Sequence, residues 1–211
     1  MKDGRRIPVD PGAVLCALVA ARSATRCHVT VHHQPSPQPQ LADDVIVLRP
    51  WRSTDASWLC EVCQDPDIQR WTRVPVPYSM SDATSFVDDL APTTWRHGTA
   101  AHFAVTDAAS GRGLGAVGLV AVDHDASCAE IGYYLASFER GRGVATRAVV
   151  LIADWALSDR GLDRLEIHVD PRNAPSAAVA ERSGFHAEQV LAQGSDPRSA
   201  RHDTVVFVRA R

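Results

Sequence analysis

The stretch Glu139-Arg140-Gly141-Arg142-Gly143-Val144-Ala145-Thr146 decides the fold, because it joins a predicted strand to a predicted helix. Ala129–Leu135, before it, is apolar enough to predict a strand. Val144–Ser158, after it, places Val149, Ile152, Trp155 and Ala156 on one helical face. The first turn of a helix has backbone N–H groups without internal partners, and the helix dipole favours an anion there. The stretch therefore predicts a cradle for a phosphate or pyrophosphate.

The residues of this turn narrow the kind of cradle. Gly141 and Gly143 lack a Cβ, so a phosphate can approach the backbone closely, and the arginines at 140 and 142 add positive charge. A Walker loop needs Lys followed by Ser or Thr where Val144-Ala145 stands. A dinucleotide fingerprint needs a third glycine where Thr146 stands. An ordinary strand–helix turn and another type of phosphate loop remain open at this point.

Length and composition exclude several classes of protein. The 211 residues suit one domain with an appendage, and the formal net charge of −3 argues against a general nucleic-acid binder. The five cysteines are scattered and odd in number, so they predict no disulfide framework. Cys60-x-x-Cys63 has no second pair, and we predict no metal site. A reduced, cytoplasmic protein without a membrane partner is expected.

Residues 1–40 differ from the rest of the chain. Basic residues precede the apolar run Ala13–Ala21, which is too short to span a membrane, and no clear cleavage site follows. Gln34–Gln40 is rich in proline and glutamine, as in a solvated linker. Cys27 and the nearby histidines have no partner cluster for a metal. We predict a poorly ordered extension with a Pro/Gln-rich linker over 1–40, and the folded domain over 41–211.

The folded part alternates between helix and strand signals. Residues Ile68–Ser79, with two prolines and two aromatic residues, are predicted as an exposed loop. It forms either a lid or acceptor-pocket wall, or a helix–helix connection that packs on its own side chains. Before the glycine-rich turn, the chain predicts a strand at Val45–Pro50, a helix from Ser53-Thr54-Asp55 to Cys63, and a helix from Ser81-Asp82 to Arg96 that Gly98 ends. Strands at Ala101–Thr106 and Leu114–Val122, joined by a turn, come next and lead to the strand and helix described above. After these follow a strand at Arg164–Val169, a helix at Ala177–Ser183 capped by Asn173, and closing strands that include Thr204–Val208.

Two separated motifs give a family resemblance. Arg140-x-x-Gly143-x-Ala145 resembles the acetyl-CoA pyrophosphate loop, [Q/R]-x-x-G-x-[G/A], of the GNAT superfamily of N-acetyltransferases. Downstream, a second set of positions is similar to the later family motif N-x-x-S-x-x-[LV]-x-x-x-x-G-F, namely Asn173, Ser176, Val179, Gly184 and Phe185. The two motifs come in the family's order, each on the expected element.

Shorter matches point to one branch of that superfamily. Leu48-Arg49-Pro50 with Asp55-Ala56, Asp65-Pro66 and Glu130-Ile131-Gly132-Tyr133 resemble the ribosomal-protein N-terminal acetyltransferases of the RimJ/RimL type. The resemblance covers about residues 45–210. It implies an α/β fold with a mixed, mostly antiparallel central sheet, a splayed parallel strand pair and about four flanking helices.

The same resemblance implies a binding site for acetyl-CoA as the acetyl donor. The pantetheine arm is expected between the splayed strands, where backbone donors near Tyr134 polarise the thioester carbonyl. The pyrophosphate is expected on the amides of the glycine-rich turn, and Asn173 orients the arm or a water. The implied cofactor-binding residues are Tyr134, Leu135, Arg140, Gly141, Arg142, Gly143, Val144, Ala145, Thr146, Asn173 and Ser176.

Two side chains have implied catalytic roles. Ser176 is expected to protonate the CoA thiolate, although a serine at a helix start also serves as a cap. Glu130 is expected to accept the proton of the attacking amine through water, and its alternative role is an edge carboxylate paired to an arginine. His168 is a second candidate base, whose alternative is a hydrogen-bonded structural histidine.

The sequence therefore predicts an acetyl-CoA-dependent N-acetyltransferase in which an amine attacks directly within a ternary complex. The branch points to a protein N-terminus as acceptor. A small-molecule amine (a polyamine, an amino acid or an antibiotic) is the alternative acceptor, and a non-catalytic acyl-CoA-binding module is the alternative class. No nucleic-acid partner is expected, and monomer and homodimer both stay open.

Overall fold

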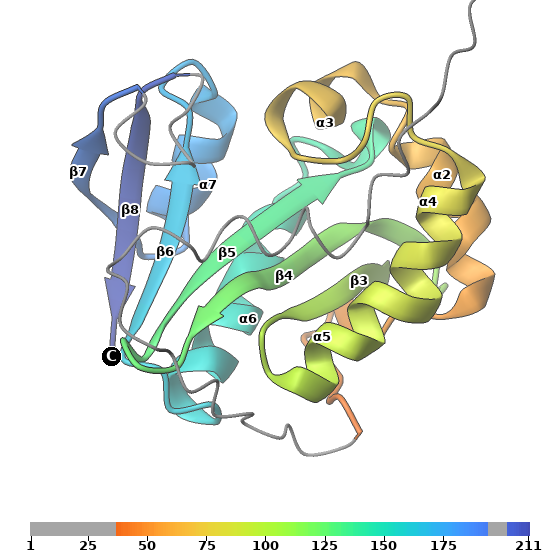
Figure 1. Cartoon of the computed structure of the whole chain (residues 1–211), viewed down its shortest axis with the longest axis horizontal. Coiled ribbons are helices and arrows are strands. Elements are labelled where there is room, and N and C mark those ends of the chain that lie inside the picture. Colours follow the sequence, from red (N-terminus) through yellow and green to blue (C-terminus); the bar gives the residue numbers. More distant parts are fainter. Residues whose placement is uncertain (1–36, 194–201) are drawn as a thin grey trace, which may run out of the picture.

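A computed structural model describes residues 37–193 and 202–211. The predictions for residues 1–36 lie outside this part of the chain. Eight strands form one sheet in the order β1-β2-β3-β4-β5-β6-β8-β7 (Figure 1). The strands are β1 (Leu41–Ala42), β2 (Ile46–Arg49), β3 (Ala101–Asp107), β4 (Gly113–Asp123), β5 (Cys128–Leu135), β6 (Arg164–Val169), β7 (His186–Leu191) and β8 (Thr204–Ala210). The helices are α2 (Ala56–Val62), α3 (Pro66–Trp71), α4 (Met80–Ser85), α5 (Ala91–His97), α6 (Val144–Ser158) and α7 (Ala174–Arg182).

The sheet is antiparallel except between β5 and β6, as predicted. Their parallel pairing covers three positions and ends at Glu130 opposite Glu166. Figure 1 shows the two strands starting together and diverging toward the ends that carry α6 and α7. Beyond Glu130, β5 continues to pair with β4, and beyond Glu166, β6 continues to pair with β8. The predicted splay is therefore present.

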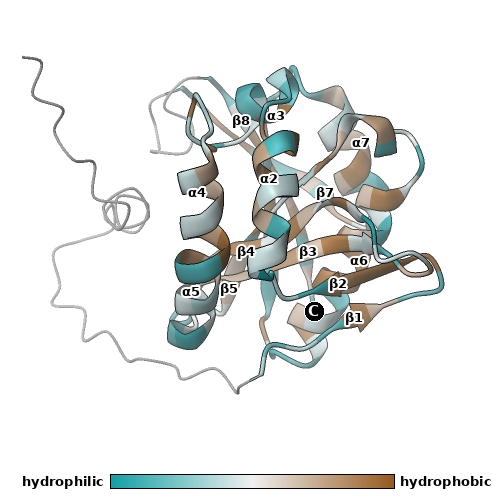
Figure 2. Cartoon of the chain, turned by 90° about the vertical axis from the view of Figure 1, so that its right-hand side faces the viewer, coloured by the Kyte–Doolittle hydropathy of each residue, from teal (hydrophilic) through white to brown (hydrophobic). Residues whose placement is uncertain are grey.

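Two layers of helices cover the sheet. One apolar cluster joins α6 and α7 to one face, and the predicted helical face of α6 is buried in it at Val149, Ile152, Trp155 and Ala156. A second cluster joins α2, α3, α4 and α5 to the other face. Figure 2, which looks onto α2 and α4, shows hydrophobic colour on the strands behind these helices. The sheet is thus buried on both sides at the end where α6 begins.

The region predicted as a loop between the first two helices contains an additional helix, which is a correction. α3 begins at Pro66 because the Asp65 carboxylate accepts hydrogen bonds from the backbone N–H of Asp67 and Ile68, at 2.8 and 3.2 Å. Asp-Pro therefore starts a helix here as well as ending one. With α3 and with α4 and α5 joined through the wide turn η2 (Phe86–Leu90), the described residues hold five helical bodies.

Helix starts differ from the predictions at three places. α4 is capped by Ser79, two residues before the predicted cap, because Ser79 and Asp82 exchange hydrogen bonds as a capping box. α7 begins at Ala174 instead of Ala177, with Asn173 as the predicted cap. The predicted cap at residues 53–55 forms a single turn, η1 (Ser53–Asp55), before α2. Gly98 ends α5 in the left-handed conformation, as predicted.

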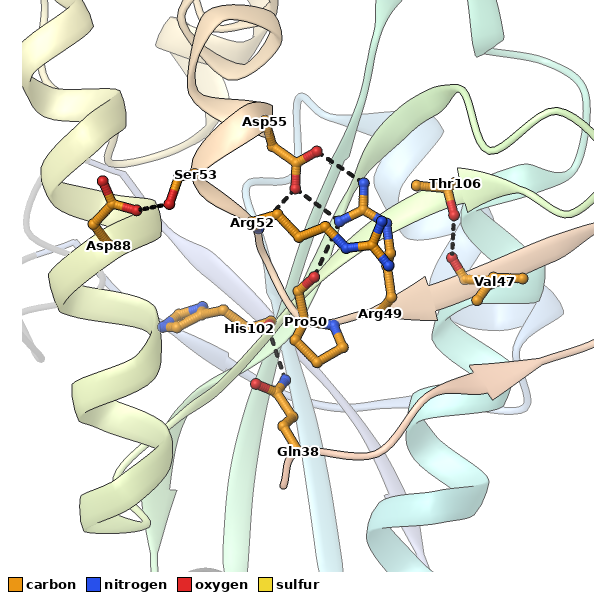
Figure 3. A network of polar contacts seen from close by, with 10 residues as sticks. All are labelled: Gln38, Val47, Arg49, Pro50, Arg52, Ser53, Asp55, Asp88, His102 and Thr106. Carbon is orange, nitrogen blue, oxygen red and sulfur yellow. Dashed lines mark hydrogen bonds and ion pairs between the residues drawn. The ribbon is translucent and has the colours of Figure 1, made fainter. Parts of the chain in front are cut away.

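A polar network ties β2 to the segments around it (Figure 3). The Asp55 carboxylate forms two bonds to the Arg49 guanidinium, at 2.7 and 2.8 Å, and accepts a third from the backbone N–H of Arg52. Gln38, from the segment predicted as a linker, donates to the backbone carbonyl of His102 at 2.9 Å. None of the helices in the described residues combines the length and apolar character that a membrane crossing needs.

Candidate functional site

The predicted cradle lies where β5 passes through the short turn η3 (Ser137–Glu139) into α6. Gly141 and Gly143 have φ values of 75° and 79°, a region that side chains disfavour. Gly143 is the N-cap of α6, and no side chain of residues 37–193 or 202–211 caps this helix. A Cβ built on either glycine meets no heavy atom within 4 Å in the described residues. The first turn of α6 thus offers uncapped amides beside open space.

Arg140 does not act as an unpaired cation, in contrast to the predicted turn. Its guanidinium lies 2.9 Å from the Asp65 carboxylate and 2.9 Å from the Asp67 carboxylate, both at the start of α3. Burial raises the pKa of Asp65, but the bonds from Arg140 and from two backbone amides more than offset it, so the net pKa is lowered. The same guanidinium also lies 3.4 Å from the carbonyl oxygen of Leu135. Arg140 therefore ties α3 to the glycine-rich turn.

Arg142 is paired as well, through a residue that sequence reasoning missed. The Glu139 side chain is 3% exposed and accepts hydrogen bonds from Arg142 at 3.0 Å and from Arg112 at 2.5 Å. Phe138, beside it, is 61% exposed and lies under the Arg112 guanidinium. Since carboxylates hold both arginines of the turn, its anion-binding capacity comes first from backbone amides. Only the position of Glu139 directly before the motif hinted at this role.

The second half of the site lies where β6 turns into α7. The Asn173 side chain accepts a hydrogen bond from the backbone N–H of Ser176 at 3.3 Å, and Pro175 occupies the first turn. This is the predicted cap, and it fixes the backbone of Ser176. The Ser176 hydroxyl then points to a partner on the other strand of the splay.

That partner is Tyr133, whose role sequence reasoning missed. The Tyr133 hydroxyl lies 2.9 Å from Ser176 Oγ and 3.0 Å from the Ser176 carbonyl oxygen. Burial raises the pKa of Tyr133 to about 12, and the bond to Ser176 opposes that rise. The sequence showed Tyr133 only as part of a family match, because a contact between residues 43 positions apart has no local signal.

Glu130 lies on the opposite face of β5 from Tyr133. Side chains alternate along a strand, and Tyr133 packs with Ile131 and Leu135 on the α6 side. Tyr134 packs on the side of α2 and α4, where its hydroxyl lies 3.9 Å from the thiol of Cys63. Glu130 shares that side with Tyr134, at the last paired position before the strands diverge. The two predicted catalytic side chains therefore approach the splay from different faces.

His168 forms a hydrogen bond within β6. Its ring Nε2 lies 2.7 Å from the Glu166 carboxylate, which also pairs with Arg164 at 2.9 Å. The bond to His168 is the largest influence on Glu166 and, with Arg164, lowers the pKa of Glu166 to about 2 despite burial. With 6% of its side chain exposed, His168 fits the structural alternative better than the role of a base that contacts substrate.

These features suit a long, flexible ligand with a pyrophosphate. The amides of Gly141 to Thr146 form an uncapped helix start, which follows the end of β5 where β5 and β6 have diverged. Tyr134 and Leu135 lie on the β5 edge, and Asn173 and Ser176 lie at the end of β6. The structure thus brings the two predicted motifs to the same splay.

Comparison with known proteins agrees with this geometry. Residues 46–186 match the family of acetyltransferase (GNAT) domains. The chain belongs to this family. The uncharacterized N-acetyltransferase p20 of Bacillus licheniformis is 25% identical over 162 residues, which cover 77% of this chain and 90% of that protein. The enzyme class predicted from the sequence, an N-acetyltransferase, is confirmed.

Two solved GNAT structures illustrate the likeness. RimJ of Mycobacterium smegmatis, solved in complex with CoA-disulfide, has a TM-score of 0.73 and 25% identity, covering 84% of this chain and 90% of that one. The microcin C7 self-immunity acetyltransferase MccE, solved with acetyl-CoA and AMP, has a TM-score of 0.70 and 24% identity, covering 80% of this chain and 94% of that one. The predicted fold and the resemblance to the RimJ/RimL branch are confirmed.

Proposed function

We propose that this GNAT protein transfers the acetyl group of acetyl-CoA to a primary amine, and that the acceptor is the N-terminus of a cytoplasmic protein. One observation carries the donor half of the proposal. The uncapped, glycine-lined start of α6 lies next to the diverging strands β5 and β6, as a pyrophosphate with a long thioester arm requires. The relatives solved with CoA or acetyl-CoA share this fold.

Residues at two helix starts, those of α6 and α7, contribute to the proposed acetyl-CoA site. Backbone amides from Gly141 to Thr146 hold the pyrophosphate, while Arg140 positions the turn against α3. Backbone groups of Tyr134 and Leu135 on the unpaired edge of β5 hold the arm and polarise the thioester carbonyl. Asn173 fixes the start of α7 and with it Ser176. Acetyl-CoA supplies the activated acetyl group.

Glu130 serves as the proton acceptor for the amine in this proposal. It lies on the face of β5 that also carries Tyr134, at the narrow end of the splay. An α-amine has a pKa of about 8, so a carboxylate acting through water gives enough help near neutral pH. Ser176, from the α7 side, protonates the leaving sulfur. The amine attacks the thioester directly, without an acyl-enzyme.

The family branch supports the proposed acceptor. The likeness to RimJ at 25% identity supports an acceptor of the ribosomal-protein type, presented as an α-amine. The helix α3 and the segment up to Ser79 pack with Tyr134, on the face of β5 that also carries Glu130 because side chains alternate along a strand, and an acceptor chain has to approach from this face. Peptides with a free N-terminus are therefore the first acceptors to test, with spermidine, free amino acids and lysine side chains as competitors.

Two measurements test the proposal. Calorimetric titration should show binding of acetyl-CoA and CoA and no comparable binding of ATP. Transfer to peptide N-termini should then fall about a hundredfold or more in Glu130→Gln, the lower end of a typical general-base contribution. The matched control is Glu181→Gln, an exposed carboxylate near the end of α7.

The outcomes separate the parts of the proposal. Equal binding of ATP would contradict the donor assignment. Acetyl-CoA binding without transfer to any amine would identify the chain as a binding module. Transfer to spermidine or amino acids, but not to peptides, would replace the protein acceptor by a small molecule. Full activity of Glu130→Gln would remove that residue from the chemistry and leave the enzyme class intact.

A further inference from the structure

The hydroxyl pair Tyr133 and Ser176 connects the two diverging units of the sheet. Tyr133 belongs to β5, three positions after the last residue that pairs with β6. Ser176 belongs to the first turn of α7, which follows β6. Their oxygens lie 2.9 Å apart, so a side-chain hydrogen bond bridges the splay beyond the end of the ladder.

The two partners differ in mobility. The Tyr133 ring packs against the main core cluster, which fixes the position of its hydroxyl. The backbone of Ser176 is held by Asn173, but a serine hydroxyl rotates about a single side-chain torsion. The geometry therefore makes Tyr133 the fixed partner and the Ser176 hydroxyl the adjustable one.

Two hydrogen-bond patterns are compatible with the measured distances. In the first, Tyr133 donates to the Ser176 carbonyl at 3.0 Å, and the Ser176 hydroxyl donates to Tyr133 Oη at 2.9 Å. In the second, Tyr133 donates to Ser176 Oγ, and the proton of Ser176 becomes available to another acceptor. Only the second pattern lets Ser176 protonate a leaving group.

We propose that Tyr133 is a positioning residue that acts through Ser176 and sets its hydroxyl for protonation of the departing CoA sulfur. This inference rests on the proposed acetyl transfer. As the C–S bond breaks, its electron pair stays on sulfur, which receives the Ser176 proton. Tyr133 passes its own proton to Ser176 Oγ, and water returns a proton to Tyr133. The amine releases one proton in the same turnover, so the total is unchanged.

The chemistry of the two hydroxyls supports this arrangement. A phenol loses its proton far more readily than an aliphatic alcohol, whose alkoxide is a poor species to leave in a half-buried site. A serine backed by a phenol therefore gives up its proton without forming a lasting alkoxide. With a pKa of about 12, Tyr133 stays protonated near neutral pH until Ser176 Oγ takes up its proton.

A double-mutant cycle tests the inference. Tyr133→Phe, Ser176→Ala and the double variant are assayed for single-turnover acetyl transfer and for acetyl-CoA binding by calorimetry. Each single variant should lose about ten- to a hundredfold in rate, and the double variant should be no slower than the slower single variant. The Kd for acetyl-CoA should stay within about threefold in Tyr133→Phe, because Tyr133 acts through Ser176 and not on the cofactor. Thr106→Val, which removes another largely buried hydroxyl bond at 3.1 Å, is the control and should keep its rate.

A second measurement does not depend on how the variants fold. In wild-type enzyme, the single-turnover rate should fall along a curve as the deuterium fraction of the solvent rises, since two protons move together. A linear dependence of the rate on the deuterium fraction would contradict proton transfer from Tyr133 to Ser176. Additive losses in the cycle, or full activity of Tyr133→Phe, would also overturn it while leaving the proposed function intact. If wild type transfers to no amine, the proposed function fails and this inference fails with it.

Discussion

The two strand–turn–helix units at the splay, β5–α6 and β6–α7, have the same order of elements. They differ in whether a side chain caps the start of the helix. α6 begins after Gly143, and no side chain in the described part of the chain caps its first turn. α7 begins after Asn173, whose side chain occupies the first-turn amide of Ser176, with Pro175 removing another donor. The start of α6 is left uncapped by the described residues, and the start of α7 is closed by Asn173 and Pro175.

This difference shows how one supersecondary unit serves two purposes. An uncapped start leaves amide donors and the positive end of the dipole for an anion. A capped start is more rigid, and here the cap holds the backbone of Ser176 in place. The two units are therefore not interchangeable, and substitutions in each of them should have different effects.

Gly143→Glu should have the largest effect. A side chain at φ 79° is strained, and a carboxylate would lie where the pyrophosphate is expected. We expect the acetyl-CoA Kd to rise at least about a hundredfold in calorimetry, or about 2.7 kcal/mol. Gly161→Glu is the control, because Gly161 has φ 67° and open space but lies beyond the other end of α6. Equal losses in both variants would contradict a specific cradle.

Glu166→Gln should remove a pH-dependent contribution to stability from the β6 unit. The folded-state pKa of Glu166 is lowered to about 2, below its ordinary value of 4.5, first by His168 and then by Arg164. A carboxyl with a lowered pKa stabilises the fold above its unfolded pKa and loses this effect as pH falls through its folded pKa. Wild type should exceed the variant by about 2 kcal/mol at pH 6, and the gap should close between pH 4.5 and 2.

Urea unfolding at several pH values measures this gap. Glu188→Gln, which removes an exposed partner of the same Arg164, is the control. A constant gap from pH 6 to pH 2 would show that the His168 and Arg164 contacts do not set the titration of Glu166.

Glu139→Gln should change stability and affinity in opposite directions. The buried carboxylate holds Arg112 and Arg142, and losing its charge should lower the free energy of unfolding by about 1 to 2 kcal/mol, since both guanidiniums reach water. The released arginines can then turn toward a phosphate, so the acetyl-CoA Kd should fall about threefold. Urea unfolding and calorimetry on the same samples measure both. An unchanged or weaker affinity would mean that Glu139 holds Arg142 in its binding position.

Asn173→Ala should have the smallest effect, about 1 kcal/mol of stability, the usual value of one N-cap. Asn173→Asp should keep the wild-type stability, because aspartate caps equally well. Urea unfolding compares the two. If both variants bind acetyl-CoA like wild type, Asn173 acts on α7 alone. A loss of binding in Asn173→Asp at unchanged stability would instead support a direct contact with the cofactor arm.

Much of the fold could be predicted from local signals. The strand–glycine turn–helix at Glu139–Thr146, the Asn173 cap and the Gly98 stop depend on neighbours in sequence, and all three are present. α3 was missed because Asp65-Pro66 both ends one helix and starts the next. It was interpreted only as the end of the first helix. Ser79 was missed as a cap because Ser81-Asp82 offered an equally good local signal.

The structure around the candidate site was predictable where it depends on the backbone and less so where it depends on side chains distant in sequence. The turn and the splay followed from the two motifs. The ion pairs of Arg140 with Asp65 and Asp67 join residues more than 70 positions apart, and the Tyr133–Ser176 bond joins different elements. Such contacts depend on tertiary packing, and a short sequence motif does not predict them.

The pairing of the arginines around the glycine-rich turn has a consequence for the rate of ligand binding. Arg112, Arg140, Arg142 and Arg147 are all bound to carboxylates, namely Asp43, Asp44, Asp65, Asp67 and Glu139. The turn therefore projects little net field into solvent, and long-range steering of an anionic ligand should be weak. The association rate constant of acetyl-CoA should then change little with ionic strength, and selectivity should appear in how slowly the ligand leaves.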